Sequence, residues 1–170
     1  GALEGTTKGL FTGTITNNAG ATISSEGDNG TVGGFRAVNG VSFQGTLNNA
    51  GTISGVENGV YFGNPTPAGG GDHTGGVVNN LAGGVISSDS RALNIDGTGL
   101  VVNNSGSILG TGDQRNGTVY ADSTAEGFTL DNQSGGLIDA GAGNEGAGFS
   151  AELSETGNDF TIINSGTIAG

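Results

Sequence analysis

Few residues in this sequence have the types and spacing that chemistry requires. His73 is the single histidine, and it follows Asp72 in the glycine-rich stretch Gly69–Gly76, where a lone imidazole is expected to be solvated. One histidine and no cysteine cannot build a zinc site. Asp28 and Asp113 lie beside glycines and offer oxygen ligands, so weak surface calcium is the one cation left open. We otherwise expect no metal and no cofactor.

The charged side chains are too scattered to predict a catalytic centre. Glycoside hydrolysis needs two carboxylates that face each other across a sugar. The carboxylates that could line a groove are Asp131, Asp139, Glu152 and Glu155. Polysaccharide lyases built on β-helices generally use a basic residue, and the basic residues here do not cluster: they are Lys8, Arg36, Arg91 and Arg115. We therefore predict no catalytic residue and expect the chain not to be an enzyme.

The overall charge and the lack of cysteine narrow the setting. Sixteen acidic residues against four basic ones give a net charge of −12, which repels nucleic acid phosphates and anionic lipids. No nucleic acid partner is therefore expected. The absence of cysteine excludes disulfides and thiolate chemistry. No apolar run approaches the roughly 18 residues of a membrane span, and no signal peptide is recognised, so we expect no membrane span in this segment.

The composition restricts the fold class. Glycine accounts for 38 of the 170 residues, and the longest stretch without it is the twelve residues Val85–Asp96. Each glycine inside a helix costs roughly 1 kcal/mol, so helical bundles are excluded. A collagen-like chain is excluded because glycine does not fall at every third position and only two prolines occur. Disorder or an all-β fold remains.

A short pattern that recurs six times decides between these two possibilities. Each copy has an apolar residue, a variable residue, an amide residue, a glycine-containing turn and an isoleucine. The leading apolar residues lie 32, 31, 24, 28 and 32 residues apart, which is typical of a solenoid. They are Ile15, Leu47, Val78, Val102, Leu130 and Ile162, and the closing residues are Ile23, Ile53, Ile86, Ile108, Ile138 and Ile168.

The spacing inside the repeat indicates strands. From asparagine to isoleucine the offset alternates between 6 and 4, and an even offset keeps both side chains on one face of a strand. The alternation predicts a different turn on alternate coils. A phenylalanine or leucine precedes five of the copies, whereas the third has Thr74 or Gly76 there. A second, weaker apolar cluster follows each isoleucine, so each repeat is predicted to hold three short strands.

These observations predict an all-β fold, a parallel and right-handed β-helix of about six coils with three short strands per coil. Residues 1–170 would form one domain. The leading and closing apolar residues named above form the predicted core. Repeated amides on one corner can stack as an inward ladder, and the alternative is an exposed turn that tolerates left-handed backbone. The ladder residues are Asn17, Asn49, Asn80, Asn104, Asn132 and Asn164.

Three copies resemble a known family. Asn49-Ala50-Gly51-Thr52-Ile53, Asn104-Ser105-Gly106-Ser107-Ile108 and Asn164-Ser165-Gly166-Thr167-Ile168 are similar to the N-S-G-T-I repeats of bacterial autotransporter passenger domains and related large surface adhesins. The resemblance covers about Gly13–Gly170. It implies a right-handed β-helix on, or released from, the outer surface of Gram-negative bacteria. The translocator of such proteins has no counterpart here, so we expect a segment or stacking module of a longer assembly.

The expected function is structural. The rod would be a non-enzymatic extracellular element at the bacterial cell surface that displays loops, such as Asn64–Gly76 and Tyr120–Gly127, to a host or surface glycan or protein. One alternative is a head-to-tail extracellular filament subunit, because the step from Ile168 to Ile15 of a second copy would be 17 residues, within the range inside the chain. The other alternative is a carbohydrate-active β-helix of the tailspike or polysaccharide lyase type.

Overall fold

The fold is built of short strands that follow the repeat. The computed structural model describes residues 2–4, 9–26, 33–38, 41–63, 75–110, 117–141, 146–153 and 158–170, and these ranges contain strands but no helix. The strands are β1 (Ala2–Glu4), β2 (Gly9–Phe11), β3 (Thr14–Asn17), β4 (Thr22–Ser24), β5 (Gly33–Val38), β6 (Val41–Phe43), β7 (Thr46–Asn49), β8 (Thr52–Gly55), β9 (Asn58–Phe62), β10 (Val77–Asn80), β11 (Val85–Ser88), β12 (Arg91–Ile95), β13 (Val101–Asn104), β14 (Ser107–Gly110), β15 (Val119–Ala121), β16 (Thr129–Asn132), β17 (Leu137–Asp139), β18 (Phe149–Ala151), β19 (Thr161–Asn164) and β20 (Thr167–Ala169).

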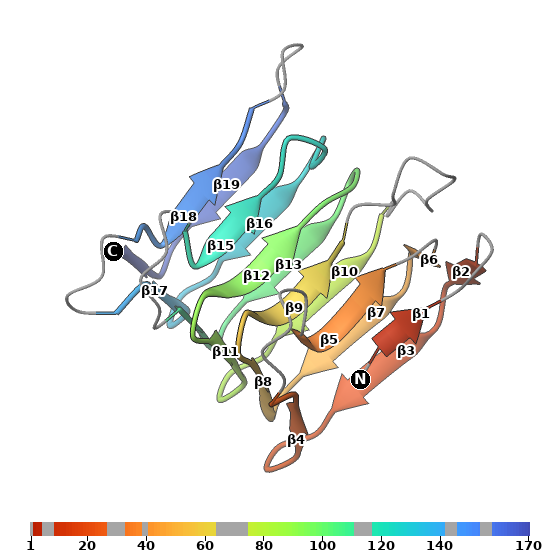
Figure 1. Cartoon of the computed structure of the whole chain (residues 1–170). Helices are drawn as coiled ribbons and strands as arrows, with labels where there is room; N and C mark the ends of the chain where they lie inside the picture. The colour runs from red at the N-terminus through yellow and green to blue at the C-terminus, as the bar shows by residue number, and fades with distance from the viewer. Residues whose placement is uncertain are drawn as a thin grey trace.

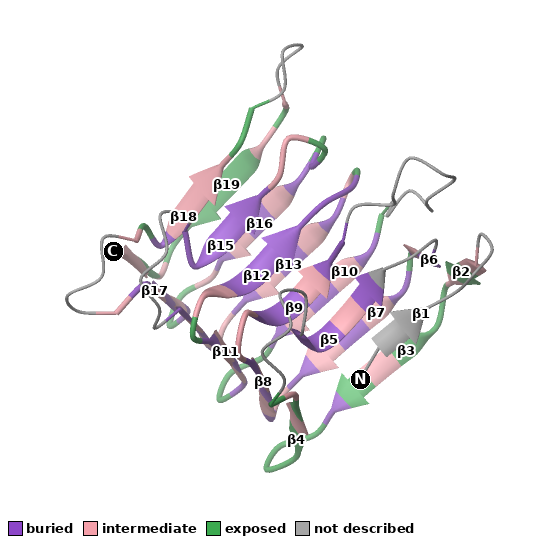
Figure 2. Cartoon of the chain, in the orientation of Figure 1, coloured by how far each residue is buried: buried purple, intermediate pink, exposed green. Residues whose placement is uncertain are grey.

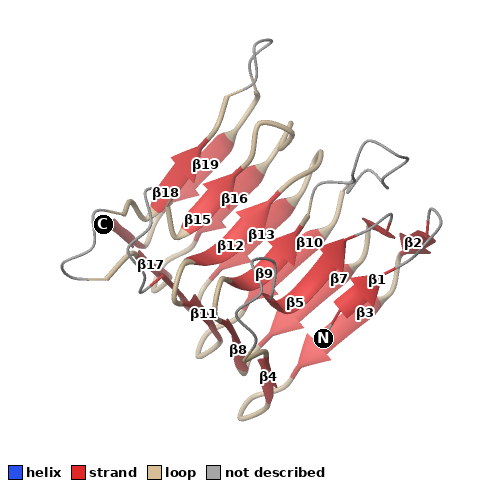
Figure 3. Ribbon diagram, viewed as in Figure 1, coloured by secondary structure: helices blue, strands red, loops and turns tan. Residues whose placement is uncertain are grey.

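Three parallel sheets form the walls of a solenoid (Figure 1 and Figure 3). Sheet I contains β1, β5, β9, β12, β15 and β18, sheet II contains β3, β7, β10, β13, β16 and β19, and sheet III contains β4, β8, β11, β14, β17 and β20. Strands β2 and β6 form a further parallel pair. The predicted β-helix with three strands per coil is therefore confirmed. Only the inner four strands of each sheet are covered on both sides, so the fully sheltered solenoid is about four coils long, slightly shorter than the six expected.

The register of the sheets stacks each repeat on its equivalent. In sheet III, Ile53 pairs with both Ile23 and Ile86, and the column continues to Ile168. In sheet II the leading apolar residues pair in the same way from Ile15 to Ile162. A repeat with one apolar residue per strand face thus becomes a continuous apolar column, which hydrophobic burial stabilises by about 1.5–3 kcal/mol per side chain.

Burial follows position along the stack (Figure 2). Eight predicted core residues are fully buried: Leu47, Ile53, Val78, Ile86, Val102, Ile108, Leu130 and Ile138. Ile15, Ile23 and Ile168 are half-buried and pack against this core from the terminal coils. The prediction was wrong for Ile162, whose side chain is 40% exposed because β19 is the edge strand of sheet II among the residues that the structure describes.

The third copy has no phenylalanine or leucine before its leading apolar residue, because a ring from the second coil already fills that space. A Cβ on Gly76 would lie 2.6 Å from Cδ1 of Phe43 and 2.9 Å from Cδ2 of Leu100, closer than side-chain atoms approach. The Phe43 ring also contacts Phe11, at 5.4 Å between ring centroids, and Phe62, at 5.1 Å. Glycine in the third coil therefore makes room for the ring of the second.

The alternating offsets correspond to two kinds of corner between sheets II and III. The long corners follow Asn17, Asn80 and Asn132, and each is a hydrogen-bonded turn that contains a glycine with φ between 77 and 86°. The short corners follow Asn49, Asn104 and Asn164. A Cβ on Gly106, in a short corner, would lie 2.3 Å from the carbonyl oxygen of Gly84 in the preceding long corner. Each short corner thus packs backbone to backbone against the long corner before it.

Candidate functional site

The six repeated asparagines lie in one column at the junction of sheets II and III. The side-chain Nδ2 of each of the first five donates to the Oδ1 of the asparagine one coil further along the chain, at 2.8 Å in all five steps. The first five residues are at most 3% exposed, and Asn164 in the last coil is exposed. The structure therefore brings together every residue of the predicted ladder, and the ladder lies inward.

A second set of bonds completes the ladder. The Nδ2 of Asn49 also donates to the carbonyl oxygen of Val85, at 3.1 Å, and that of Asn80 donates to the carbonyl oxygen of Ser107, at 3.0 Å. Asn17, Asn104 and Asn132 make the same contact with the next coil. Both amide hydrogens are thus used, and each corner is tied to the start of the next sheet III strand. The arrangement stabilises buried polar groups and leaves the inner amides no N–H donor for a ligand.

A second asparagine ladder, on the outer face of sheet II, was not predicted from the sequence. Asn79 donates to the Oδ1 of Asn48 at 2.8 Å, and Asn103 donates to that of Asn79 at 2.9 Å. These side chains are half-buried on the outer face of sheet II. The register continues the row to Asp131, where a carboxylate replaces the amide and the ladder stops. The Asn-Asn doublets of the second, third and fourth copies were the available signal.

Polar and aromatic side chains form a row on the outer face of sheet I. In register across this sheet, one row contains Arg36, Tyr61, Asn94, Tyr120 and Ser150. This row includes both tyrosines of the chain. Tyr61 and Arg36 are half-buried, whereas Asn94 and Tyr120 are 7% and 8% exposed. The Oδ1 of Asn94 is buried and accepts no hydrogen bond within the described part of the chain.

Tyr120 is held by contacts from neighbouring coils. The guanidinium carbon of Arg91 lies 4.4 Å from the centre of its ring, within cation–π range. The Tyr120 hydroxyl donates to Oε2 of Glu152 at 2.5 Å. Burial, above all, raises the pKa of the Tyr120 phenol well above its ordinary value; the hydrogen bond to Glu152 and the charges of Glu152 and Asp122 add to the rise, and Arg91 opposes it. The phenol therefore stays protonated over the physiological range.

The carboxylates proposed for a groove do not meet in the described residues. Asp131 lies on β16 in sheet II, Asp139 on β17 in sheet III, and Glu152 follows β18 in sheet I. These three carboxylates do not line one groove, because the register of the coils places them on different walls. Glu155 lies outside the described residues. Within the described ranges no three acidic or histidine side chains come together as a metal site.

Other predicted positions also lie outside the described residues. They are His73, Asp72, Asp28, Asp113, Lys8, Arg115 and most of the loop Asn64–Gly76. The second loop proposed for display, Tyr120–Gly127, is a compact turn: the amide of Ala125 donates to the carbonyl oxygen of Asp122, and Ala125 is fully buried. This loop follows the wall of the solenoid rather than projecting from it.

Comparisons with models of protein families, with curated proteins and with solved structures give no match to this chain. In the described ranges no helix has the length and apolar character needed to cross a membrane. What the geometry defines is a class of architecture, a three-sided β-solenoid with an asparagine ladder.

Proposed function

We propose that this chain is a non-enzymatic structural and adhesive element of the bacterial cell surface or extracellular space, related to autotransporter passengers and surface adhesins. In this proposal the solenoid is a stiff rod, and the outer face of sheet I contacts a surface glycan. The observation that carries the proposal is the unbroken asparagine ladder, which joins all six coils by hydrogen bonds at 2.8 Å.

The ladder supports a scaffold because it fixes the spacing of neighbouring coils. Parallel strands in a sheet lie about 4.8 Å apart, so Tyr61 and Tyr120, two strands apart in sheet I, lie about 10 Å apart along the rod. Within the row Tyr61 is half-buried and can meet a glycan, whereas Asn94 and Tyr120 are only 7% and 8% exposed and support the face from within. The ring of Tyr61 offers an apolar face and a polar edge to sugars.

The alternative of a carbohydrate-active enzyme has less support. Retaining and inverting hydrolysis both need a pair of carboxylates across one bond, and Asp131, Asp139 and Glu152 lie on three different sheets. Glu152 is also engaged by the Tyr120 hydroxyl. Incubation of the protein with surface polysaccharides, followed by size analysis of the polysaccharide, should show no shortening. Shortened polysaccharide would support the carbohydrate-active alternative instead.

A glycan-binding assay tests the adhesive part of the proposal. The purified chain is applied to an array of bacterial and host polysaccharides, and bound glycans are then titrated by calorimetry. Tyr61→Ala should weaken binding about tenfold, as expected for an aromatic anchor. Asp131→Ala, an equally surface-facing change on sheet II, should leave it unchanged. Binding that is insensitive to Tyr61→Ala, or no binding to any glycan, would contradict the assignment of the sheet I face.

A further inference from the structure

One buried amide on the outer face of sheet I has no hydrogen-bond partner for its oxygen. Asn94 lies on β12 between Tyr61 of β9 and Tyr120 of β15, its neighbours in register. Its side chain is only 7% exposed, and its Oδ1 is buried without a donor in the described part of the chain. A buried acceptor without a donor destabilises a folded chain, so its presence needs a physical reason.

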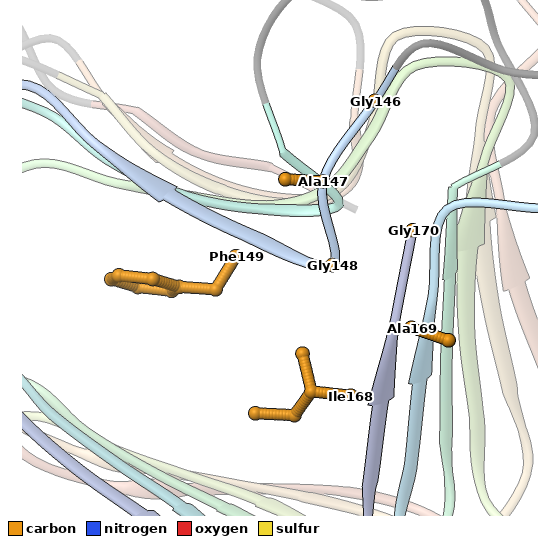
Figure 4. A pocket seen from close by; sticks show the side chains of 7 residues that line it. All are labelled: Gly146, Ala147, Gly148, Phe149, Ile168, Ala169 and Gly170. Atoms are coloured by element: carbon orange, nitrogen blue, oxygen red, sulfur yellow. The ribbon is translucent and has the colours of Figure 1, made fainter.

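The interior of the solenoid does not supply that reason. Side chains along a strand alternate between the two faces of its sheet, and Leu93 and Ile95, on either side of Asn94, are fully buried in the core. On β18 of the same sheet Phe149 points inward, as does Ile168 of sheet III (Figure 4). Asn94 therefore lies on the side of sheet I where a glycan is proposed to bind.

The outer face of sheet II shows how an asparagine that only stabilises this fold is bonded. Asn79, on β10, donates to one neighbouring asparagine at 2.8 Å and accepts from the other at 2.9 Å. Equal amides on successive coils satisfy one another in this way. Asn94 has a tyrosine on each side instead of an amide, so no ladder forms there. Its oxygen is left for a donor from outside the chain.

The two tyrosine rings that flank Asn94 differ in exposure. Tyr120 is 8% exposed; the guanidinium carbon of Arg91 lies 4.4 Å from the centre of its ring, and its hydroxyl donates to Glu152. Tyr61 is half-buried, so part of its ring already reaches solvent. A ligand that stacks on Tyr61 would therefore displace this ring rather than that of Tyr120, and would uncover the Oδ1 of Asn94.

The groups around this amide select the chemistry of the ligand. An amide oxygen needs a hydrogen-bond donor, which a sugar hydroxyl provides. Three carboxylates directly follow β12, β15 and β18, against two arginines on the same face: Asp96, Asp122 and Glu152, with Arg36 and Arg91. Together with the net charge of −12, this excess of negative charge disfavours a glycan that carries carboxylates or sulfates. A neutral glycan fits the face best.

We infer that the Oδ1 of Asn94 is the acceptor of a closed glycan subsite on sheet I, which opens when Tyr61 moves aside and then binds a hydroxyl of a neutral sugar. The inference rests on the proposed adhesive function and names the polar contact and the ligand class within it. Tyr61 and Asn94 lie on neighbouring strands, about 4.8 Å apart, so one sugar ring can contact both. Binding supplies the hydrogen bond that folding leaves unmade.

Asn94→Leu tests the inference, because leucine removes the amide and keeps a side chain of similar size. Since folding leaves the amide oxygen unbonded, the urea midpoint should not fall. The dissociation constant for neutral glucans, mannans or galactans, measured by calorimetry, should rise about tenfold. Alginate, a polyuronate, should bind the unmodified chain at least about tenfold more weakly than the neutral polymers. The chain has no tryptophan, so the fluorescence of a Tyr120→Phe variant reports Tyr61 alone and should change on binding.

Asn79→Leu is the matched control, since it makes the same substitution on the outer face of sheet II, where the amide has two hydrogen bonds. It should lower the urea midpoint and leave glycan binding unchanged. An Asn94→Leu variant that binds as tightly as the unmodified chain, or that loses as much stability as Asn79→Leu, would overturn the inference and leave the proposed contact at Tyr61 standing. Alginate bound as tightly as the neutral polymers would overturn the ligand class. An unmodified chain that binds no glycan would remove the proposed function, and the inference with it.

Discussion

Breaking the asparagine ladder at its centre should destabilise the solenoid far more than the loss of one small side chain suggests. Asn104→Ala removes three hydrogen bonds: the one that Asn80 donates to Asn104, and those that Asn104 donates to Asn132 and to the carbonyl oxygen of Leu137. At about 1 kcal/mol each these contribute about 3 kcal/mol. The buried Oδ1 of Asn132 also loses its donor, which costs about 1–2 kcal/mol more. We expect a loss of about 4–5 kcal/mol in the free energy of unfolding.

Two matched variants separate the ladder from local strand effects. Asn103→Ala changes the neighbouring residue in the same strand but removes a single bond on the outer face, to Asn79, and should cost about 1 kcal/mol or less. Asn164→Ala removes the acceptor at the exposed end of the ladder, where water can replace it, and should also cost about 1 kcal/mol or less.

Urea unfolding followed by far-ultraviolet circular dichroism measures all three variants. The midpoint should move while the slope stays constant, since the same surface is exposed on unfolding. Repeat proteins can unfold in parts, so a second probe, such as tyrosine fluorescence, must give the same transition before free energies are compared. If Asn104→Ala costs no more than Asn103→Ala, the ladder does not stabilise the fold and the case for a stiff rod fails.

Three further outcomes follow from the packing and from the titration of one phenol. Gly76→Ala should lower the free energy of unfolding by about 1–3 kcal/mol, because its methyl group enters the space of an aromatic ring. The control Gly135→Asn, at an exposed turn with φ of 86°, should cost less than about 1 kcal/mol. Equal costs in urea unfolding would contradict the packing argument. Ile138→Ala should cost about 2–5 kcal/mol of stability, and Ile162→Ala less than about 1 kcal/mol, because the Ile162 side chain is already 40% exposed. Calorimetric melting that finds Ile162→Ala the more destabilising variant would show that β19 is covered. Because the folded-state pKa of Tyr120 is raised, its stabilising contribution is complete below about pH 10, the value in the unfolded chain, and is lost as the pH rises towards the folded-state value. Thermal melting from pH 8 to 12 should show a fall in melting temperature that Tyr120→Phe reduces. Identical pH profiles of the two proteins would refute this.

The ladder and the apolar columns were predictable because a solenoid converts repetition in sequence into contact in space. Once the chain coils with one repeat per turn, Asn49, Asn80 and Asn104 must stack, whatever the intervening residues are. The core residues of the inner coils follow from the same rule. The exposure of Ile162 could not be predicted from its repeat, which is the same as that of the others, because exposure depends on whether another coil lies beyond it.

The face of sheet I could not be predicted for a different reason. The repeat is weakest there, so the register of β9, β12, β15 and β18 is set by the packing of the inward side chains rather than by a repeated motif. The contact of Tyr120 with Glu152 joins residues 32 positions apart and depends on that register. The same holds for the separation of Asp131, Asp139 and Glu152 onto three walls.

The amino-acid sequence by itself therefore determined the coil, its period, the buried amides and the alternation of its corners, because each of these repeats and repeated residues are stacked by the solenoid. Only the tertiary structure decided which side chains meet on the outer faces and how deeply each inward residue is buried. Those properties depend on how many coils lie on either side and on the register between walls, and neither is recorded in the order of residues within a single repeat.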